Sequence, residues 1–231
     1  MMLVVILFLA LQLLIVLRYP KVQHDQSTDS AQERREDSLS IPAFALRYRL
    51  FMLTMIGVMC LAACHAMAEN YLIHVFSRIG GGSEHVGVAL FLACITAAPF
   101  MIFFERIQTR LSVTILLRLS GIFYIAKAIL LIWSPSILSV YLIELLQTVT
   151  YAFLYPSLYY LVVRRIAAPD MAKGQTLTSA LFTLGMAIGN SLGGVALEAV
   201  GLSAMLALAA CIAAAGTLLV NITISKKDSP V

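Results

Sequence analysis

Charged residues are scarce in this sequence. Only 12% of its 231 residues are Asp, Glu, Lys or Arg, whereas 61% are hydrophobic. Soluble globular domains carry roughly 25% charged residues, which keep their surfaces compatible with water. The scarcity excludes a soluble globular protein and predicts an all-α protein that crosses a membrane several times.

Extracellular cysteines and catalytic motifs are lacking as well. The four cysteines all fall within apolar runs, where they offer neither an extracellular disulfide framework nor a metal cluster (Cys60, Cys64, Cys94 and Cys211). The sequence contains no HExxH motif, no GxSxG motif and no paired intramembrane aspartates. We therefore expect no enzyme activity, no metal and no cofactor.

Long apolar runs are what the sequence has in abundance. Each is near the length that crosses the roughly 30 Å hydrocarbon core of a bilayer. They predict seven transmembrane helices, the fifth long or tilted, at residues 2–17, 50–71, 86–104, 112–133, 137–163, 174–197 and 202–224. Short connections join the last six, which we expect to pack as antiparallel neighbours.

One hydrophilic segment separates the first predicted helix from the other six. The predicted organisation is a transmembrane helix at 1–17, a cytoplasmic linker at 18–48, a six-helix block at 49–225 and a cytoplasmic tail at 226–231. The linker is rich in Gln, Ser, Asp, Glu and Arg and has few apolar residues to bury. We therefore expect no packed core in it.

The basic residues predict the orientation. Fourteen of the 16 Lys and Arg residues fall at same-side ends of the runs, whereas Arg78 falls on the other side and Lys127 inside a run. Cytoplasmic loops collect Lys and Arg. The sequence thus predicts a multi-pass protein of the cytoplasmic membrane, with its N-terminus outside and its C-terminus in the cytoplasm. The net charge of +4 reflects this orientation, not nucleic-acid binding.

A polar stripe runs along residues 141–163. At 100° per residue its members lie within about 60° of one line down the helix; they are Glu144, Gln147, Thr148, Tyr151, Tyr155 and Tyr159. Polar groups in membrane helices face protein or water. We interpret the stripe as the wall of a cavity in which Gln147, Tyr151 and Tyr155 bind a solute. Alternatively, the tyrosines are core aromatics whose hydroxyls bond to neighbouring helices.

Lys127 and Glu144 are candidates for an intramembrane ion pair. Their positions in consecutive antiparallel helices place them about 9 and 10 Å from the outer helix ends. Pairing would offset the roughly 2.5–3.5 kcal/mol that insertion scales assign to a central charge. Two interpretations remain open: a static bridge, or a pair that protonation or substrate breaks.

Further candidates lie near the outer end of the second predicted helix. His65 and Glu69 are one helical turn apart, and Asn70 and Tyr71 follow directly. This set could bind solute hydroxyls, or His65 and Glu69 could relay a proton. Alternatively, Glu69 simply reaches interfacial water.

Short motifs follow one another in a specific order along the chain. They lie at residues 80–82, 86–90, 105–110, 169–170, 174–175 and 189–194, the last shortly before Gly201. Over residues 45 to 225 this order resembles the C-terminal half of a major facilitator superfamily transporter, most closely the lactose-permease-like proton symporters of sugars and small organic acids. The resemblance implies that 1–17 corresponds to the sixth of twelve helices, that 18–48 is the central loop, and that an N-terminal half is missing.

These observations together predict a secondary active transporter. It would move a small polar solute, such as a sugar or an organic acid, across the cytoplasmic membrane, with proton coupling through His65, Lys127 and Glu144 as one form of the mechanism. The expected partners are the lipid bilayer, the solute, protons, and a complementary N-terminal half or a second copy of the chain. The alternative is a non-transporting fragment or a partner subunit of a split transporter.

Overall fold

The computed structural model describes residues 39–224. Within this range the chain is helical, with no strand. Six helical segments are apolar and long enough to cross a membrane: Arg49–Asn70, Ser83–Ile102, Val113–Ile132, Ile137–Arg165, Ala168–Val200 and Leu202–Thr223. The all-α membrane fold and the last six predicted spans are confirmed. The helix predicted at 2–17 lies outside the described residues.

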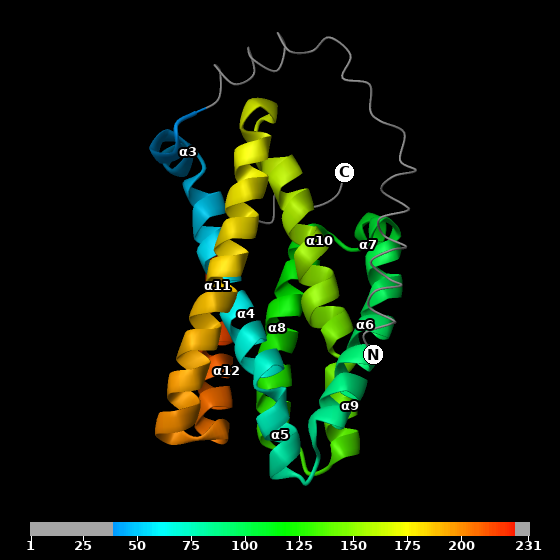
Figure 1. Cartoon of the computed structure of the whole chain (residues 1–231). Helices are drawn as coiled ribbons and strands as arrows, with labels where there is room; N and C mark the ends of the chain where they lie inside the picture. Colours follow the sequence, from blue (N-terminus) through cyan, green and yellow to red (C-terminus); the bar gives the residue numbers. More distant parts are fainter. Residues whose placement is uncertain (1–38, 225–231) are drawn as a thin grey trace, which may run out of the picture. The chain divides into compact units, whose positions relative to one another are not determined.

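The spans run antiparallel and are joined by short helices and turns (Figure 1). The elements are α3 (Ile41–Arg47), α4 (Arg49–Asn70), α5 (Leu72–Arg78), α6 (Ser83–Ile102), α7 (Phe104–Arg110), α8 (Val113–Ile132), α9 (Ile137–Glu144), α10 (Gln147–Arg165), the 3-10 turn η1 (Ala168–Asp170), α11 (Met171–Val200) and α12 (Leu202–Thr223). Ser112 caps α8, and Ser136 forms a capping box with Ser139 at the start of α9. Gly201, at φ +82°, makes the turn between α11 and α12.

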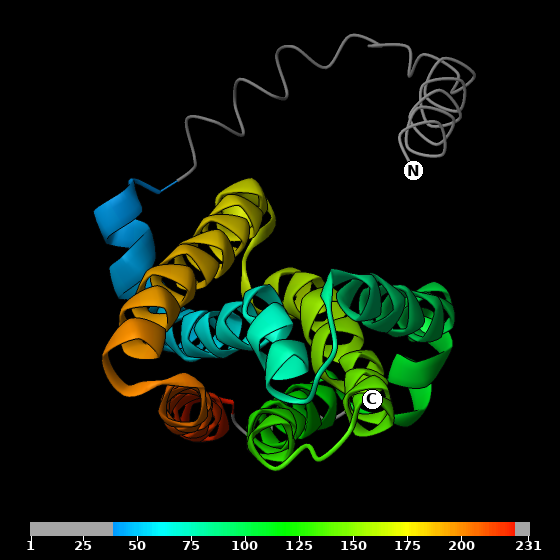
Figure 2. The same ribbon diagram turned by 60° about the horizontal axis from the view of Figure 1, so that its bottom comes forward.

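Helix α4 lies at the centre of the block and packs against α11, α12 and α8, while α10 lies between α8 and α6 (Figure 2). Glycines allow the closest of these contacts. Gly57 of α4 faces Gly216 of α12, and Gly185 and Gly189 of α11 lie against the backbone of α4. In lipid, where apolar surface is already solvated, such close backbone approach supplies the packing energy that joins helices.

The fifth predicted span is interrupted. Hydrogen bonds from Leu146 N to Ile143 O (3.0 Å) and from Thr148 N to Leu145 O (3.2 Å) tighten the chain between α9 and α10. Helix α10 then continues through Pro156, and the interruption of the span falls at 145–146. The predicted polar stripe is consequently divided between α9 and α10.

The last ten residues of the predicted linker are packed against the six-helix block. Pro42 lies in the first turn of α3, and Phe44 is fully buried in the core. Asp170 accepts hydrogen bonds from Leu39 N (2.9 Å) and from the Tyr48 hydroxyl (3.3 Å). The expectation of an unpacked linker is therefore wrong for residues 39–48, because a few apolar and aromatic side chains suffice to anchor a short helix.

We expect Asp170→Ala to loosen α3. Hydrogen bonds to a charged acceptor contribute about 1.5–3 kcal/mol each, so trypsin should cleave after Arg47 at least about tenfold faster in the detergent-solubilised variant. Glu105→Ala removes an exposed carboxylate from α7 and serves as the matched control. Equal cleavage rates in the two variants would contradict the anchoring role.

Candidate functional site

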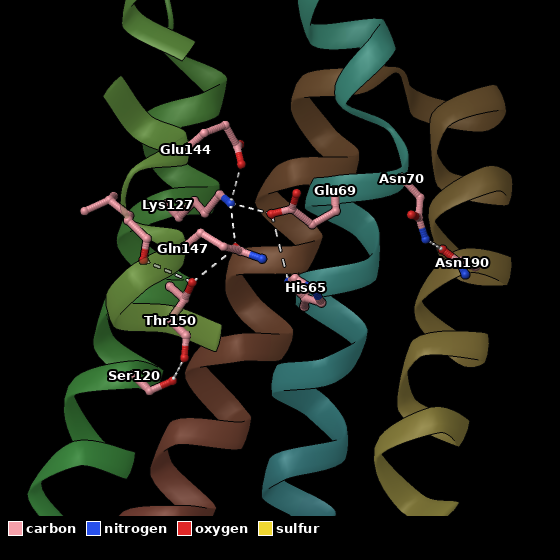
Figure 3. A network of polar contacts seen from close by, with 10 residues as sticks. His65, Glu69, Asn70, Ser120, Lys127, Glu144, Gln147, Thr150 and Asn190 are labelled. Carbon is pink, nitrogen blue, oxygen red and sulfur yellow. Dashed lines mark hydrogen bonds and ion pairs between the residues drawn. The ribbon is translucent and has the colours of Figure 1, made fainter. Parts of the chain in front are cut away.

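A buried lysine organises the polar centre of the block. Lys127 of α8 is 1% exposed. Its Nζ donates hydrogen bonds to Glu69 Oε1 of α4, to Glu144 Oε2 of α9 (2.9 Å) and to Gln147 Oε1 of α10 (3.1 Å), as Figure 3 shows. Three partners from three helices compensate a charge that would otherwise be costly inside a membrane.

His65 extends this cluster toward the tyrosines of α10. Its Nδ1 lies 4.0 Å from Glu69 Oε1, one helical turn away on α4. Its ring stacks on Tyr151 with 5.3 Å between the centroids. The structure thus brings together His65, Glu69, Lys127, Glu144 and Gln147, which the sequence offered as separate groups. The contact between Glu69 and Lys127 was missed, because sequence spacing carries no signal for which distant helices face each other.

The cluster contains one more carboxylate than it has ammonium groups. Glu69 and Glu144 both bond to Lys127, and their side chains are 10% and 0% exposed. Among the described residues, no group hydrogen-bonds to Glu69 Oε2, Glu144 Oε1 or His65 Nδ1. An unpaired buried charge is strongly unfavourable. The arrangement is therefore chemically suited to take up one proton or another monovalent cation.

Asn70 and Tyr71 lie apart from this cluster. Asn70 Nδ2 donates to Asn190 Oδ1 (2.6 Å), and the Tyr71 hydroxyl donates to the Asn190 carbonyl (2.6 Å). In Figure 3 Asn70 and Asn190 point toward each other from α4 and α11, on the side of α4 away from Lys127. Both predicted solute-binding residues are thus engaged in joining two helices.

The tyrosines of α10 form a ladder. Tyr151 stacks on Tyr155 (5.4 Å between centroids), and Tyr155 meets Tyr159 edge-on (5.5 Å). The hydroxyls of Tyr155 and Tyr159 are 3.3 Å apart. Phe182 of α11 contacts Tyr151 and Tyr155. All three tyrosines are half-buried, so each keeps part of its ring accessible.

A cavity of about 630 Å³ continues from this ladder along α11. Its lining residues are Tyr159, Gln175, Thr176, Ser179, Ala180 and Thr183. The α11 contribution was missed, although Gln175, Ser179 and Thr183 recur every fourth residue and so mark one face of a helix. We call this cavity the α10–α11 groove. Its amide and hydroxyl groups can exchange hydrogen bonds with a polar solute.

Comparisons with known proteins agree with this architecture. Residues 1–208 match the model of the MFS_1 like family. No curated protein matches the chain at a significant level. Because the family model covers most of the chain and the described part has six apolar helices of spanning length, the chain belongs to the MFS_1 like family of multi-pass membrane proteins, a family of transporter type.

Proposed function

We propose that this chain is one half of a secondary active transporter that moves a small polar solute across the cytoplasmic membrane. The observation that carries the proposal is the buried cluster of Glu69, Lys127 and Glu144, connected through His65 and the tyrosine ladder to the α10–α11 groove. Ionisable groups inside membrane helices typically mark solute or ion pathways. Such pathways lie at the interface between two halves that rock about a central site.

The groove favours a neutral, hydroxyl-rich solute. The described residues that line it include no charged side chain, and they offer hydroxyls, one amide and the ring of Tyr159. Hydroxyls and amides pair with sugar hydroxyls, while a tyrosine ring packs against an apolar sugar face. A small organic acid would need a compensating cation from elsewhere. A sugar-like solute is therefore our first choice.

Proton coupling follows from the extra carboxylate. A proton on Glu144 or Glu69 would leave a neutral cluster in which Lys127 pairs with the remaining carboxylate. Loss of the proton would leave two charged carboxylates sharing Lys127, as in this structure. In the proposal, the two protonation states favour different arrangements of α4, α8 and α9. Solute binding can be linked to transport if it favours one of them.

A covering partner is part of the proposal. The polar groups of the groove lie on the accessible faces of α10 and α11, and exposure to lipid would cost several kcal/mol for unsatisfied polar groups. A complementary six-helix half, or a second copy of the chain, would cover the groove and complete the site.

Liposome transport tests the function. The purified chain is reconstituted alone and together with a candidate N-terminal half, and uptake of labelled sugars and organic acids is followed under an imposed proton gradient. We expect gradient-driven uptake only with a partner or an oligomer, lost in Glu144→Gln and kept in the control Glu198→Gln, which changes an exposed carboxylate. Saturable uptake by a verified monomer would contradict the half-transporter. A partner complex that binds but never transports would support the non-transporting subunit.

The orientation is tested by labelling. Basic residues gather at one end of the described helices, at Arg47, Arg49, Arg106, Arg110, Arg118, Arg164, Arg165 and Lys173. The positive-inside rule makes this end cytoplasmic. In a background without native cysteines, we expect an impermeant maleimide to label Ser136→Cys in intact cells and Thr109→Cys only after permeabilisation. Both positions are exposed, so the reverse pattern would overturn the orientation.

A further inference from the structure

A second cavity lies where α3 meets α4, at the end of the block that carries most of the basic residues. Its volume is about 240 Å³, and its lining residues are Arg47, Tyr48, Arg49, Leu50, Phe51 and Arg165. Three arginines line it, and no acidic residue in the described part of the chain does. It is separate from the transport site, because none of its residues belongs to the Lys127 cluster or to the α10–α11 groove.

Two of these arginines are available to a ligand. Neither Arg47 nor Arg49 forms an ion pair or a hydrogen bond through its side chain with another residue of the described range 39–224. The Arg47 guanidinium lies 5.8 Å from the centroid of the Tyr48 ring, and Arg165 Nη1 donates to Thr223 O (3.4 Å). An anion bound beside Arg47 and Arg49 is attracted by both of their guanidinium groups.

Two residues that line the cavity, Tyr48 and Phe51, are fixed by contacts with the rest of the block. Tyr48, which forms part of its wall, donates its hydroxyl to Asp170 Oδ2 (3.3 Å) and accepts a hydrogen bond from Ala167 N (3.2 Å). Phe51, also in the wall, is 2% exposed and packs against the fully buried Phe44. A ligand that binds here does not have to order these side chains first, which favours affinity.

Exposed apolar side chains lie on α3 and at the start of α4, near the arginines in sequence. Leu46 is 79% exposed and Leu50, which lines the cavity, is 55% exposed. Ile41 at the start of α3 is 66% exposed. Because the α4 span begins at Arg49, these residues lie at the boundary between headgroups and acyl chains. The arginines therefore suit a phosphate group, and the exposed apolar side chains near them suit hydrocarbon.

We propose that this cavity binds an anionic phospholipid. Arg47 and Arg49 contact the headgroup phosphate, and the acyl chains run along Leu46 and Leu50 toward the membrane interior. Basic pockets beside transmembrane helices recognise anionic headgroups through the same chemistry. A soluble phosphate would engage the arginines and leave the leucines uncovered, so the lipid accounts for both features. The site stands independently of any transported solute.

Native mass spectrometry of the purified full chain in detergent tests the proposal. It is titrated with phosphatidylglycerol and with phosphatidylcholine of the same acyl chains. We expect one phosphatidylglycerol to bind at least about tenfold more tightly than phosphatidylcholine. Arg47→Ala/Arg49→Ala should weaken that binding about thirtyfold, equivalent to about 2 kcal/mol for two arginines. Arg106→Ala/Arg110→Ala removes the same charge from α7 at the same end, and should bind like the wild type.

Other outcomes are equally decisive. Equal binding of the two lipids, or equal loss in both double variants, would show only general attraction to a membrane surface and would overturn the site. Displacement of the lipid by millimolar glycerol phosphate would identify a soluble phosphate as the ligand. If Arg47→Ala/Arg49→Ala does not fold, electron paramagnetic resonance of spin-labelled lipids on the wild-type chain decides: selectivity for phosphatidylglycerol supports the proposal, and its absence contradicts it.

Discussion

Lys127→Ala is expected to remove most of the folded protein, whereas Glu69→Gln and Glu144→Gln are expected to leave it folded. The reason is charge balance. Lys127 is the ammonium that two buried carboxylates share, so its loss leaves both without a counter-charge. Breaking a buried ion pair from one side costs about 3–5 kcal/mol. Loss of either carboxylate leaves one lysine paired with one glutamate.

The measurement is the yield of monodisperse protein in detergent, followed by thermal unfolding. Glu69→Gln/Glu144→Gln should be as damaging as Lys127→Ala, because it strands the lysine. The triple variant Lys127→Gln/Glu69→Gln/Glu144→Gln carries no charge and should regain much of the yield. If each single glutamate variant is as unstable as Lys127→Ala, charge balance does not govern this cluster.

Gly189→Ala is expected to separate α11 from α4. A Cβ atom at Gly189 would lie 2.3 Å from Ala63 O and 2.6 Å from Ala63 Cα. Both are backbone atoms, which cannot rotate away, so the two helices must shift apart. Overpacking of this kind costs about 1–3 kcal/mol. The same shift would open the close approach of Gly185 to the Met59 backbone.

Gly87→Ala provides the matched control. A Cβ atom at Gly87, within α6, would have no neighbour within 4 Å. The replacement should be neutral, or stabilising by up to about 1 kcal/mol through helix propensity. Thermal unfolding in the same detergent compares the two variants. Equal melting temperatures would mean that the backbone contact between α11 and α4 does not limit stability.

The apolar runs predicted the spans because bilayer thickness sets the length of a membrane helix. The depth of Lys127 and Glu144 followed from the same arithmetic, and the two side chains meet in the structure. The family follows from the residues at 1–208. The lactose-permease-like subgroup, the solute and the partner stay predictions.

Helix rotation and pairing were decided by tertiary structure. Periodicity tells which residues share a face of one helix, and it says nothing about which helix lies opposite. The contact between Glu69 and Lys127, which are 58 residues apart in the sequence, was therefore not predicted. Asn70 hydrogen-bonds to Asn190 of α11 instead of lining a solute site. The break at 145–146 coincides with shortened local hydrogen-bond spacing in a stretch without proline or glycine. No sequence pattern therefore predicted it.

The sequence alone thus determined that this chain is a helical membrane protein with polar residues at defined depths. Helix length and the depth of polar residues can be predicted from the sequence alone, because unsatisfied polar groups are excluded from the hydrocarbon region. Close packing of α4 against α11 and α12 through glycines decided which of those polar residues form one cluster. That outcome depends on how backbones fit together in three dimensions, and no single helix encodes it.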